Sequence, residues 1–334
     1  MGNKSSKSRQ TNMLKSRKPS KNSFRYSDGR RFHNDTKYIM PNDDEEVDRL
    51  QMQHFLYRNI WNGNYSAPVT EFLERGNCKV LDVGCGPGTW LLDMSTTYQG
   101  STFIGIDISP IFPTGIKPPN LTFYAANVLK GLPFPDNHFD FVYMRNLIIA
   151  FTEDEWNTVI GELIRVVKPG GWIELMEGNL EFEGEGACAQ VLLGAFRSIL
   201  RSNSMNPKIC SQIYTFLSTS PLLKSFSFKE KLIPIGKWAG KIGEIASQDF
   251  CSLFLAVRGA ICRVLEDERI IKGCSCGIKE CHVGNEIFDK DGKNICDHEN
   301  RWNEEYGELI QEIARECNEE KANYRHYRFF AQKI

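Results

Sequence analysis

Short apolar runs alternate with mixed polar and apolar segments through the middle of the chain. Strand-like runs occupy residues 79–83, 102–107, 121–126, 139–143 and 172–176. Strands that alternate with helices indicate right-handed crossovers and a parallel sheet. The pattern therefore predicts a doubly wound α/β fold for this part of the chain.

Two helices have clear start signals. Thr152 and Glu155 have the spacing of a capping box, and the turn at residues 168–171 ends the helix. Its apolar face consists of Trp156, Val159, Ile160, Leu163 and Val167. Asn42, with Glu45 three residues later, predicts a second helix that continues to about Trp61.

The alternation changes after about residue 180. Helices are expected over residues 185–225 and 245–270, and a strand over 228–238. A last helix is expected to lead into a strand-like run at 324–334. We divide the chain into a disordered basic tail (1–37), a core (38–180), a helical substrate or cap region (181–300) with a cysteine-rich insert (272–300), and a terminal helix and strand that return to the core sheet (301–334).

Composition and charge refine this division. The chain has 334 residues, 41% of them hydrophobic, which suits one large α/β domain with additions or two small ones. Its net charge is −1, but residues 1–40 hold eleven Lys and Arg against only Asp28 and Asp35. The remaining residues number 30 basic and 40 acidic. The sequence therefore combines an acidic globule with a basic tail, which we expect to be disordered.

The sequence also bears on the cellular compartment. No stretch approaches the run of about 20 apolar residues that a membrane-spanning helix needs, and no apolar signal-peptide core follows the start. The 11 cysteines are odd in number and scattered, which is typical of reduced thiols. We expect a cytoplasmic protein, with the nucleus as the alternative because of the basic tail.

A glycine-rich corner follows the first predicted strand. Gly84, Gly86 and Gly88 have GxGxG spacing, and Thr89 stands where a dinucleotide-binding fingerprint needs glycine. Asp107 ends the second strand, where a carboxylate can accept hydrogen bonds from both ribose hydroxyls. Asn127 follows the third strand, where an amide can pair with adenine.

These stretches resemble, in order and spacing, the motifs of class I S-adenosylmethionine-dependent methyltransferases over about residues 38–178. The resemblance implies a Rossmann-like, mostly parallel seven-stranded sheet, S-adenosyl-L-methionine as cofactor, and methyl transfer without a metal. The family more often has Asp at the position of Asn127. The resemblance assigns cofactor contacts to Asp82, Gly84, Cys85, Gly86, Gly88, Asp107, Ile108, Asn127 and Val128.

A closer resemblance is to the LaeA-like fungal methyltransferases, carried by residues 38–43, 53–54, 103–109 and 169–174 with Arg49. It implies that the segment before the first strand covers the cofactor, with Tyr38, Arg49 or His54 as lid residues and Arg49 near the methionine carboxylate. The alternative is that Arg49 pairs with acids on its own helix. The same resemblance implies a rival function, a non-catalytic cofactor-binding regulator that acts through a protein partner.

Candidates near the transferred methyl group are Arg145, Asn146 and Glu177, at the carboxyl ends of the fourth and fifth strands. Glu177 is a candidate base and Arg145 a candidate carboxylate ligand. The alternative for each is a supporting or solvent-exposed position. No motif identifies the acceptor, which remains either a small molecule or a protein.

Two further motifs lie near the chain's start and in its insert. Residues 1–6 match an N-myristoylation pattern at Gly2, and the basic tail would supply a second signal for an anionic membrane surface. The alternative is a nuclear-import or nucleic-acid-binding patch. In the insert, Cys274, Cys276, Cys281 and Cys296 offer zinc ligands, but their spacing is not that of paired CxxC motifs. We therefore expect reduced cysteines and no metal.

Overall fold

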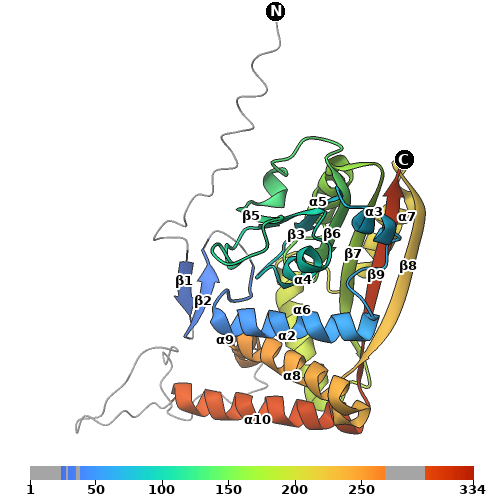
Figure 1. Ribbon diagram of the computed structural model, residues 1–334. Helices are drawn as coiled ribbons and strands as arrows, with labels where there is room; N and C mark the ends of the chain where they lie inside the picture. The colour runs from blue at the N-terminus through green and yellow to red at the C-terminus, as the bar shows by residue number, and fades with distance from the viewer. Residues whose placement is uncertain (1–23, 28, 35–37, 268–297) are drawn as a thin grey trace, which may run out of the picture.

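The computed structural model describes residues 24–27, 29–34, 38–267 and 298–334. Within them, seven strands form one sheet (Figure 1). In spatial order these are β5 (Leu121–Ala125), β4 (Thr102–Asp107), β3 (Lys79–Val83), β6 (Phe139–Arg145), β7 (Val167–Glu183), β9 (Asn323–Lys333) and β8 (Leu223–Pro234). Strands β5 to β7 pair in parallel, and β9 runs antiparallel to β7 and β8. The predicted doubly wound, mostly parallel sheet is confirmed.

The strand sequences bury both faces of this sheet because successive side chains point to opposite sides. In β3, Val80 packs into one core cluster and Leu81 into the other, and both are fully buried. Strand β6 repeats this arrangement with Tyr143 on the first side and Val142 on the second. The continuous apolar runs in the sequence follow from this two-sided burial.

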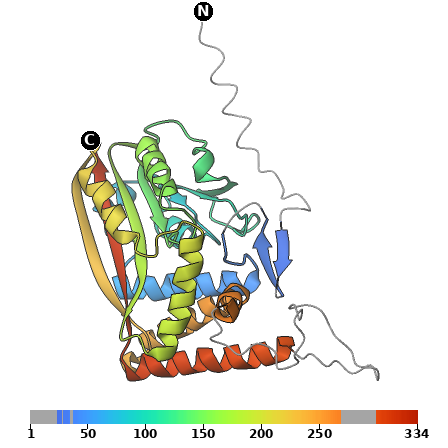
Figure 2. The ribbon, with the colours of Figure 1, turned by 180° about the vertical axis from the view of Figure 1, so that it is seen from behind.

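Helices cover each face of the sheet (Figures 1 and 2). Helices α2 (Asp44–Trp61), α3 (Thr70–Arg75) and α4 (Thr89–Thr97) contribute to the cluster around Val80. Helices α5 (Glu155–Val166), α6 (Ala187–Ser202) and α7 (Cys210–Thr219) contribute to the cluster around Leu81.

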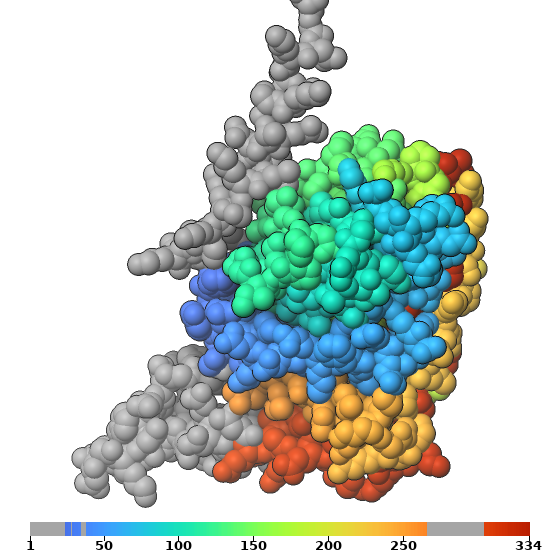
Figure 3. Space-filling model, viewed as in Figure 1, coloured from blue at the N-terminus to red at the C-terminus, as the bar shows by residue number. Residues whose placement is uncertain are grey.

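A cap of further helices lies beside α2. Helix α8 (Gly240–Ala256) packs against α2, and α10 (His298–Glu319) packs against α8. Helix α9 (Arg258–Asp267) packs against α6, and two short 3-10 turns span Val128–Lys130 (η1) and Lys237–Ala239 (η2). Figure 3 shows α2 as a blue band between the sheet region and the orange and red cap helices. Helix α2 is therefore the boundary between the two parts.

Three local predictions need correction. Residues 24–33 were expected to be disordered, but Phe24–Ser27 (β1) and Arg30–His33 (β2) form a hairpin. The guanidinium of Arg31 lies over the ring of Phe24, and Arg30 pairs with Asp43 at the start of α2. The composition of residues 1–37 predicts disorder because it does not show these contacts between residues that are separated along the chain.

The start of α2 and the course of β8 also differ from the prediction. Asp43, not Asn42, caps α2 by accepting the N–H of Glu46. Strand β8 starts and ends about five residues earlier than expected, because Gly236 turns the chain at a φ of 128° and pairing with β9 includes polar residues such as Lys224. The capping box of Thr152 and Glu155 is confirmed, with both reciprocal hydrogen bonds present.

No single helix in the described ranges is long and apolar enough to cross a membrane. The segments Lys237–Ala256 and Arg258–Leu265 are long and apolar enough only when taken together, and they are bent by 69° where they meet. The cysteines in these ranges are free thiols: Cys78, Cys85, Cys188, Cys210, Cys251, Cys262 and Cys317.

Candidate functional site

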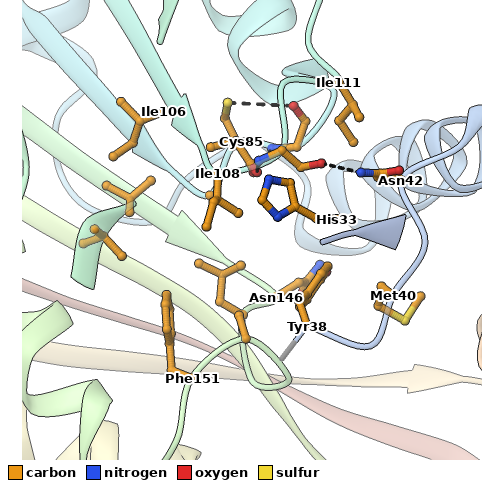
Figure 4. A pocket seen from close by; sticks show the side chains of 18 of the residues that line it. His33, Tyr38, Met40, Asn42, Cys85, Ile106, Ile108, Ile111, Asn146 and Phe151 are labelled. Atoms are coloured by element: carbon orange, nitrogen blue, oxygen red, sulfur yellow. Dashed lines mark hydrogen bonds between the residues drawn. The ribbon is translucent and has the colours of Figure 1, made fainter. Parts of the chain in front are cut away.

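A cavity of about 310 Å³ lies where β3, β4 and β6 end, beside the start of α2 (Figure 4). Here β4 lies on one side of β3 and β6 on the other, so the strand order reverses. Ligands of open α/β sheets bind at such switch points. We call this space the first cavity. Its wall combines the β3–α4 loop with the segment at residues 38–53, which we call the lid.

The glycine loop gives the first cavity its floor. Gly84, Gly86 and Gly88 all have positive φ, as predicted for a sharp turn. A Cβ at Gly84 would lie 2.6 Å from Leu147, whereas one at Gly86 would meet nothing closer than Leu50 at 3.7 Å. The loop therefore needs glycine for different reasons: close packing at Gly84, and open space beside the cavity at Gly86.

Asp107 lies at the end of β4 with its carboxylate on the cavity wall. Oδ2 accepts the N–H of Gly86 at 2.8 Å, and Oδ1 accepts the N–H of Ser109 at 2.7 Å. Burial raises the pKa of Asp107 to about 6, opposed by these N–H donors. Each carboxylate oxygen retains a lone pair, so Asp107 can still accept two hydroxyl groups.

Other predicted cofactor contacts also reach this wall. Ile108, Val128 and Cys85 line the cavity beside Asn127. The side-chain oxygen of Asn127 accepts the N–H of Leu129 at 2.9 Å and so caps η1. This hydrogen bond fixes the amide orientation and leaves Nδ2 as the group that can donate to a base.

The lid is tied to the sheet by contacts that the sequence did not reveal. Asn42 donates from Nδ2 to Ser109 Oγ at 2.8 Å, which joins the start of the lid to the loop after β4. Tyr38 lines the first cavity, as expected for a lid residue. Figure 4 shows Tyr38, Met40 and Asn42 from the lid around the same space as Cys85 and Ile108.

Arg145 lies at the end of β6 and lines the first cavity. Its Nη1 is 3.2 Å from Nδ1 of His54, and Nε2 of His54 is 3.3 Å from Asp93. His54 is buried and does not line the cavity, and burial lowers its pKa. Within the described ranges Arg145 has no carboxylate partner. It is therefore a cation available to an anionic group in the cavity.

Arg49 was predicted to lie near the methionine carboxylate, with pairing to acids on its own helix as the alternative. Arg49 does not line the first cavity and is already paired. Its Nη2 bonds to Glu46 at 2.6 Å and its Nη1 to Asp249 of α8 at 2.9 Å, all in a buried setting. Glu46 lies on the same helix, as the alternative interpretation expected. Arg49 therefore joins the lid to the cap.

Asp82 and Gly88 also lie off the cavity wall. Asp82 is buried under the loop, its Oδ1 has no hydrogen-bond partner in the described ranges, and burial raises its pKa to about 7. Gly88 is the residue before α4, where a Cβ would come within 2.5 Å of Phe123. Both positions shape the loop and lie outside the cavity wall.

A second, smaller cavity of about 120 Å³ adjoins the first and shares Tyr38, Gln53 and Asn146 in its wall. Glu177 lines it from β7, with Oε1 accepting the N–H of Leu147 and Oε2 that of Ile148. Burial raises the pKa of Glu177 to about 8. Of the catalytic candidates, Arg145 thus lines the first cavity, Glu177 the second, and Asn146 both.

Several predictions lie outside the described residues. These are acylation at Gly2 and the zinc candidates Cys274, Cys276, Cys281 and Cys296. In the described ranges, Cys188, Glu312 and Glu316 come within ligand distance of one another. Glu316 already accepts the N–H groups of Cys188 and Ala189, so this group caps α6.

The strand order and the loop that joins Gly86 to Asp107 define a class I methyltransferase fold with a nucleoside-binding switch point. Comparison with known proteins agrees. The model of the methyltransferase domain family matches residues 80–171. The N-methyltransferase gliN of Aspergillus fumigatus is 30% identical over 240 residues, which are 68% of this chain and 83% of gliN. The chain belongs to the S-adenosylmethionine-dependent methyltransferases.

Two other relatives match over shorter stretches. The N-methyltransferase verN of Clonostachys rogersoniana is 34% identical over 144 residues, 42% of this chain and 50% of verN. The secondary metabolism regulator laeA of Aspergillus fumigatus is 30% identical over 171 residues, 48% of this chain and 44% of laeA. The chain thus spans about half the length of these two relatives.

Proposed function

We propose that this chain binds S-adenosyl-L-methionine in the first cavity and transfers its methyl group to a nitrogen atom of a small-molecule acceptor. The main support for this proposal is the hydrogen bond from the N–H of Gly86 to Asp107, at the point where the strand order reverses. The residues present fit the cofactor: the open space at Gly86 admits a ligand against the backbone, and Asp107 has free lone pairs. The nitrogen acceptor is supported by the similarity to gliN and verN, which are named N-methyltransferases.

Each residue of the first cavity has a definable task. Asp107 would accept the ribose hydroxyls, and Asn127 would donate Nδ2 to the base beside Val128. Arg145 would pair with the amino-acid carboxylate. When bound, the cofactor supplies an electrophilic methyl group on its sulfonium sulfur. The lid excludes water, which favours alignment of the acceptor with that methyl.

As the new N–C bond forms, the methyl–sulfur bond of the cofactor would break, and an acceptor nitrogen that carries a hydrogen would lose one proton. Of the two carboxyl groups that line the second cavity, Asp249 is paired with Arg49, whereas Glu177 accepts only backbone N–H groups. Glu177 is therefore the group placed to take the proton. With a pKa of about 8, Glu177 is ionised in roughly a tenth of the molecules at pH 7, and this ionised form is a stronger base than an ordinary carboxylate.

The test is transfer of a labelled methyl group from S-adenosylmethionine into the small-molecule, protein and nucleic-acid fractions of an extract. We expect label in the small-molecule fraction, bound to nitrogen, and a rate that falls at least 100-fold in Glu177→Gln. Label confined to protein would contradict the acceptor class.

The similarity to laeA supports a second candidate, a cofactor-binding regulator that acts through a protein partner. Turnover separates the two. If the protein binds S-adenosylmethionine yet forms no S-adenosylhomocysteine with any extract fraction, the regulatory function is favoured.

A further inference from the structure

The second cavity lies between the lid, the cap and the sheet. Leu50 and Gln53 come from the lid, Phe250 from α8, and Glu177 and Tyr324 from β7 and β9. It shares Tyr38, Met40 and Asn146 with the first cavity. A molecule bound in the second cavity would therefore lie directly beside a molecule bound in the first.

The charges in its wall are compensated. The carboxylate of Asp249 bonds to Arg49 at 2.9 Å and accepts Nε2–H of Gln53 at 3.0 Å. Glu177 is fully buried, and its pKa near 8 keeps it protonated at neutral pH. The wall therefore offers no uncompensated charge to bind an ionic ligand, and entry of an ion would cost its hydration.

The remaining wall is rich in rings. Phe182 and Phe250 pack with centroids 4.8 Å apart, and Phe250 and Phe254 with centroids 4.7 Å apart. Aromatic side chains recognise flat apolar ligands by edge and face contacts. The aromatic residues of this wall are Tyr38, Tyr57, Phe182, Phe196, Phe250, Phe254 and Tyr324.

Two of the three tyrosines that line this cavity lie beside His326. The rings of Tyr57 and Tyr324 both contact the buried ring of His326, at centroid distances of 4.7 and 5.6 Å. Among the described residues neither hydroxyl has a hydrogen-bond partner, although Tyr57 is only 6% exposed. Both residues line the cavity, so their hydroxyls can donate to a ligand that accepts hydrogen bonds.

A chain of hydrogen bonds fixes the polar boundary between the cavities. Because the Asp249 carboxylate only accepts, Gln53 donates to it from Nε2 and accepts with Oε1 from Asn146 Nδ2 at 2.8 Å. Asn146 Oδ1 then accepts from His326 Nε2 at 3.3 Å. Asn146 is held in a left-handed conformation with φ 54°. The amide of Asn146 is thus oriented from both ends.

We propose that the second cavity binds a neutral, ring-bearing small molecule with hydrogen-bond acceptor atoms, and that Tyr57 and Tyr324 select it. This molecule is the methyl acceptor class, so the inference rests on the proposed function. Asn146 is the positioning residue that borders its reacting end.

The test uses three probes of one shape and different charge: benzamide (neutral), benzoate (anionic) and benzamidine (cationic). Binding to the full chain loaded with S-adenosylhomocysteine is measured by saturation-transfer NMR. We expect benzamide to bind and the two ions to bind at least tenfold more weakly. Tyr57→Phe and Tyr324→Phe should each weaken benzamide about three- to tenfold.

Matched variants locate the binding. Ala246 lines the second cavity, so Ala246→Phe should abolish benzamide binding by filling it. Tyr214→Phe alters an exposed tyrosine outside the cavity and should change nothing. Equal binding of benzoate or benzamidine, or benzamide binding that both Tyr→Phe variants leave unchanged, would overturn the proposal.

Binding of S-adenosylhomocysteine to the same variants, measured by calorimetry, separates the two claims. If the wild-type chain does not bind S-adenosylhomocysteine, the proposed function is refuted. If the chain binds S-adenosylhomocysteine but does not bind benzamide, only the assignment of the second cavity is refuted.

Discussion

The guanidinium of Arg145 donates to Nδ1 of His54 across 3.2 Å, and this contact links the end of β6 to α2. Because His54 accepts at Nδ1, it carries its hydrogen on Nε2 and donates that hydrogen to Asp93. His54 is therefore neutral and leaves the positive charge of Arg145 uncompensated at the wall of the first cavity. The predicted ligand of that charge is the amino-acid carboxylate of the cofactor.

Arg145→Met should weaken binding of S-adenosylhomocysteine about 10- to 100-fold, the effect of losing a charge-assisted hydrogen bond. It should leave 5′-methylthioadenosine unchanged, since that nucleoside lacks the amino-acid group. Calorimetry with both ligands measures the difference. Arg58→Met, which removes a half-exposed partner of Asp93, is the control. An equal loss for the two ligands would assign Arg145 a structural role only.

Arg49→Met should act on stability. It would leave Glu46 and Asp249 buried without their cation, at a cost of about 3–5 kcal/mol in the free energy of unfolding. Arg315→Met removes an exposed pair on α10 and should cost less than about 1 kcal/mol. Urea denaturation measures both. Similar midpoints for these two variants would show that the lid does not depend on Arg49.

Gly86→Ala should abolish cofactor binding by placing a methyl group in the open space beside the loop. Gly170 has a positive φ of 78° and likewise has room for a Cβ, but it lies outside the first cavity. Gly170→Ala therefore carries the same backbone strain, about 1–2 kcal/mol, without the steric effect. We expect loss of S-adenosylhomocysteine binding in the first variant alone. Comparable losses in both would mean that strain, and not contact, sets the affinity.

Cofactor binding should weaken severalfold as the pH falls through about 6. The pKa of Asp107 is raised by burial, so its carboxylate is ionised above pH 6 and protonated below it. Ribose hydroxyls favour the ionised, accepting form. Asp107→Asn should bind weakly with a flat pH profile.

The same substitution should also change the pH dependence of folding. A carboxyl group with a raised pKa costs stability above its unfolded value near 4, and this cost disappears at lower pH. Asp107→Asn should therefore be more stable than wild type at pH 8 but not at pH 4. Parallel unfolding curves at the two pH values would contradict the buried position of Asp107.

The sequence predicted what depends on neighbours along the chain. The glycine turn, the end of β4 at Asp107 and the capping box at Thr152 each follow from residues within a few positions of one another. Apolar runs located the strands because both faces of the sheet are buried.

What the sequence did not reveal depends on distant pairs. Asp249 lies 200 positions from Arg49, and no local pattern predicts that the two side chains form an ion pair. Asn146 and His326 are 180 positions apart, so their bond across the cavity boundary was also unpredictable. Likewise, Arg30 of the β1–β2 hairpin forms an ion pair with Asp43 of the lid, which stabilises the hairpin.

The most direct test of the whole account is a calorimetric titration of the full chain with S-adenosylmethionine, S-adenosylhomocysteine and NAD⁺. The account predicts that the two sulfur compounds each bind at one site per chain, that Gly86→Ala loses both, and that NAD⁺ gives no binding heat. Binding of NAD⁺ in preference to S-adenosylmethionine, or no binding of either sulfur compound, would contradict it.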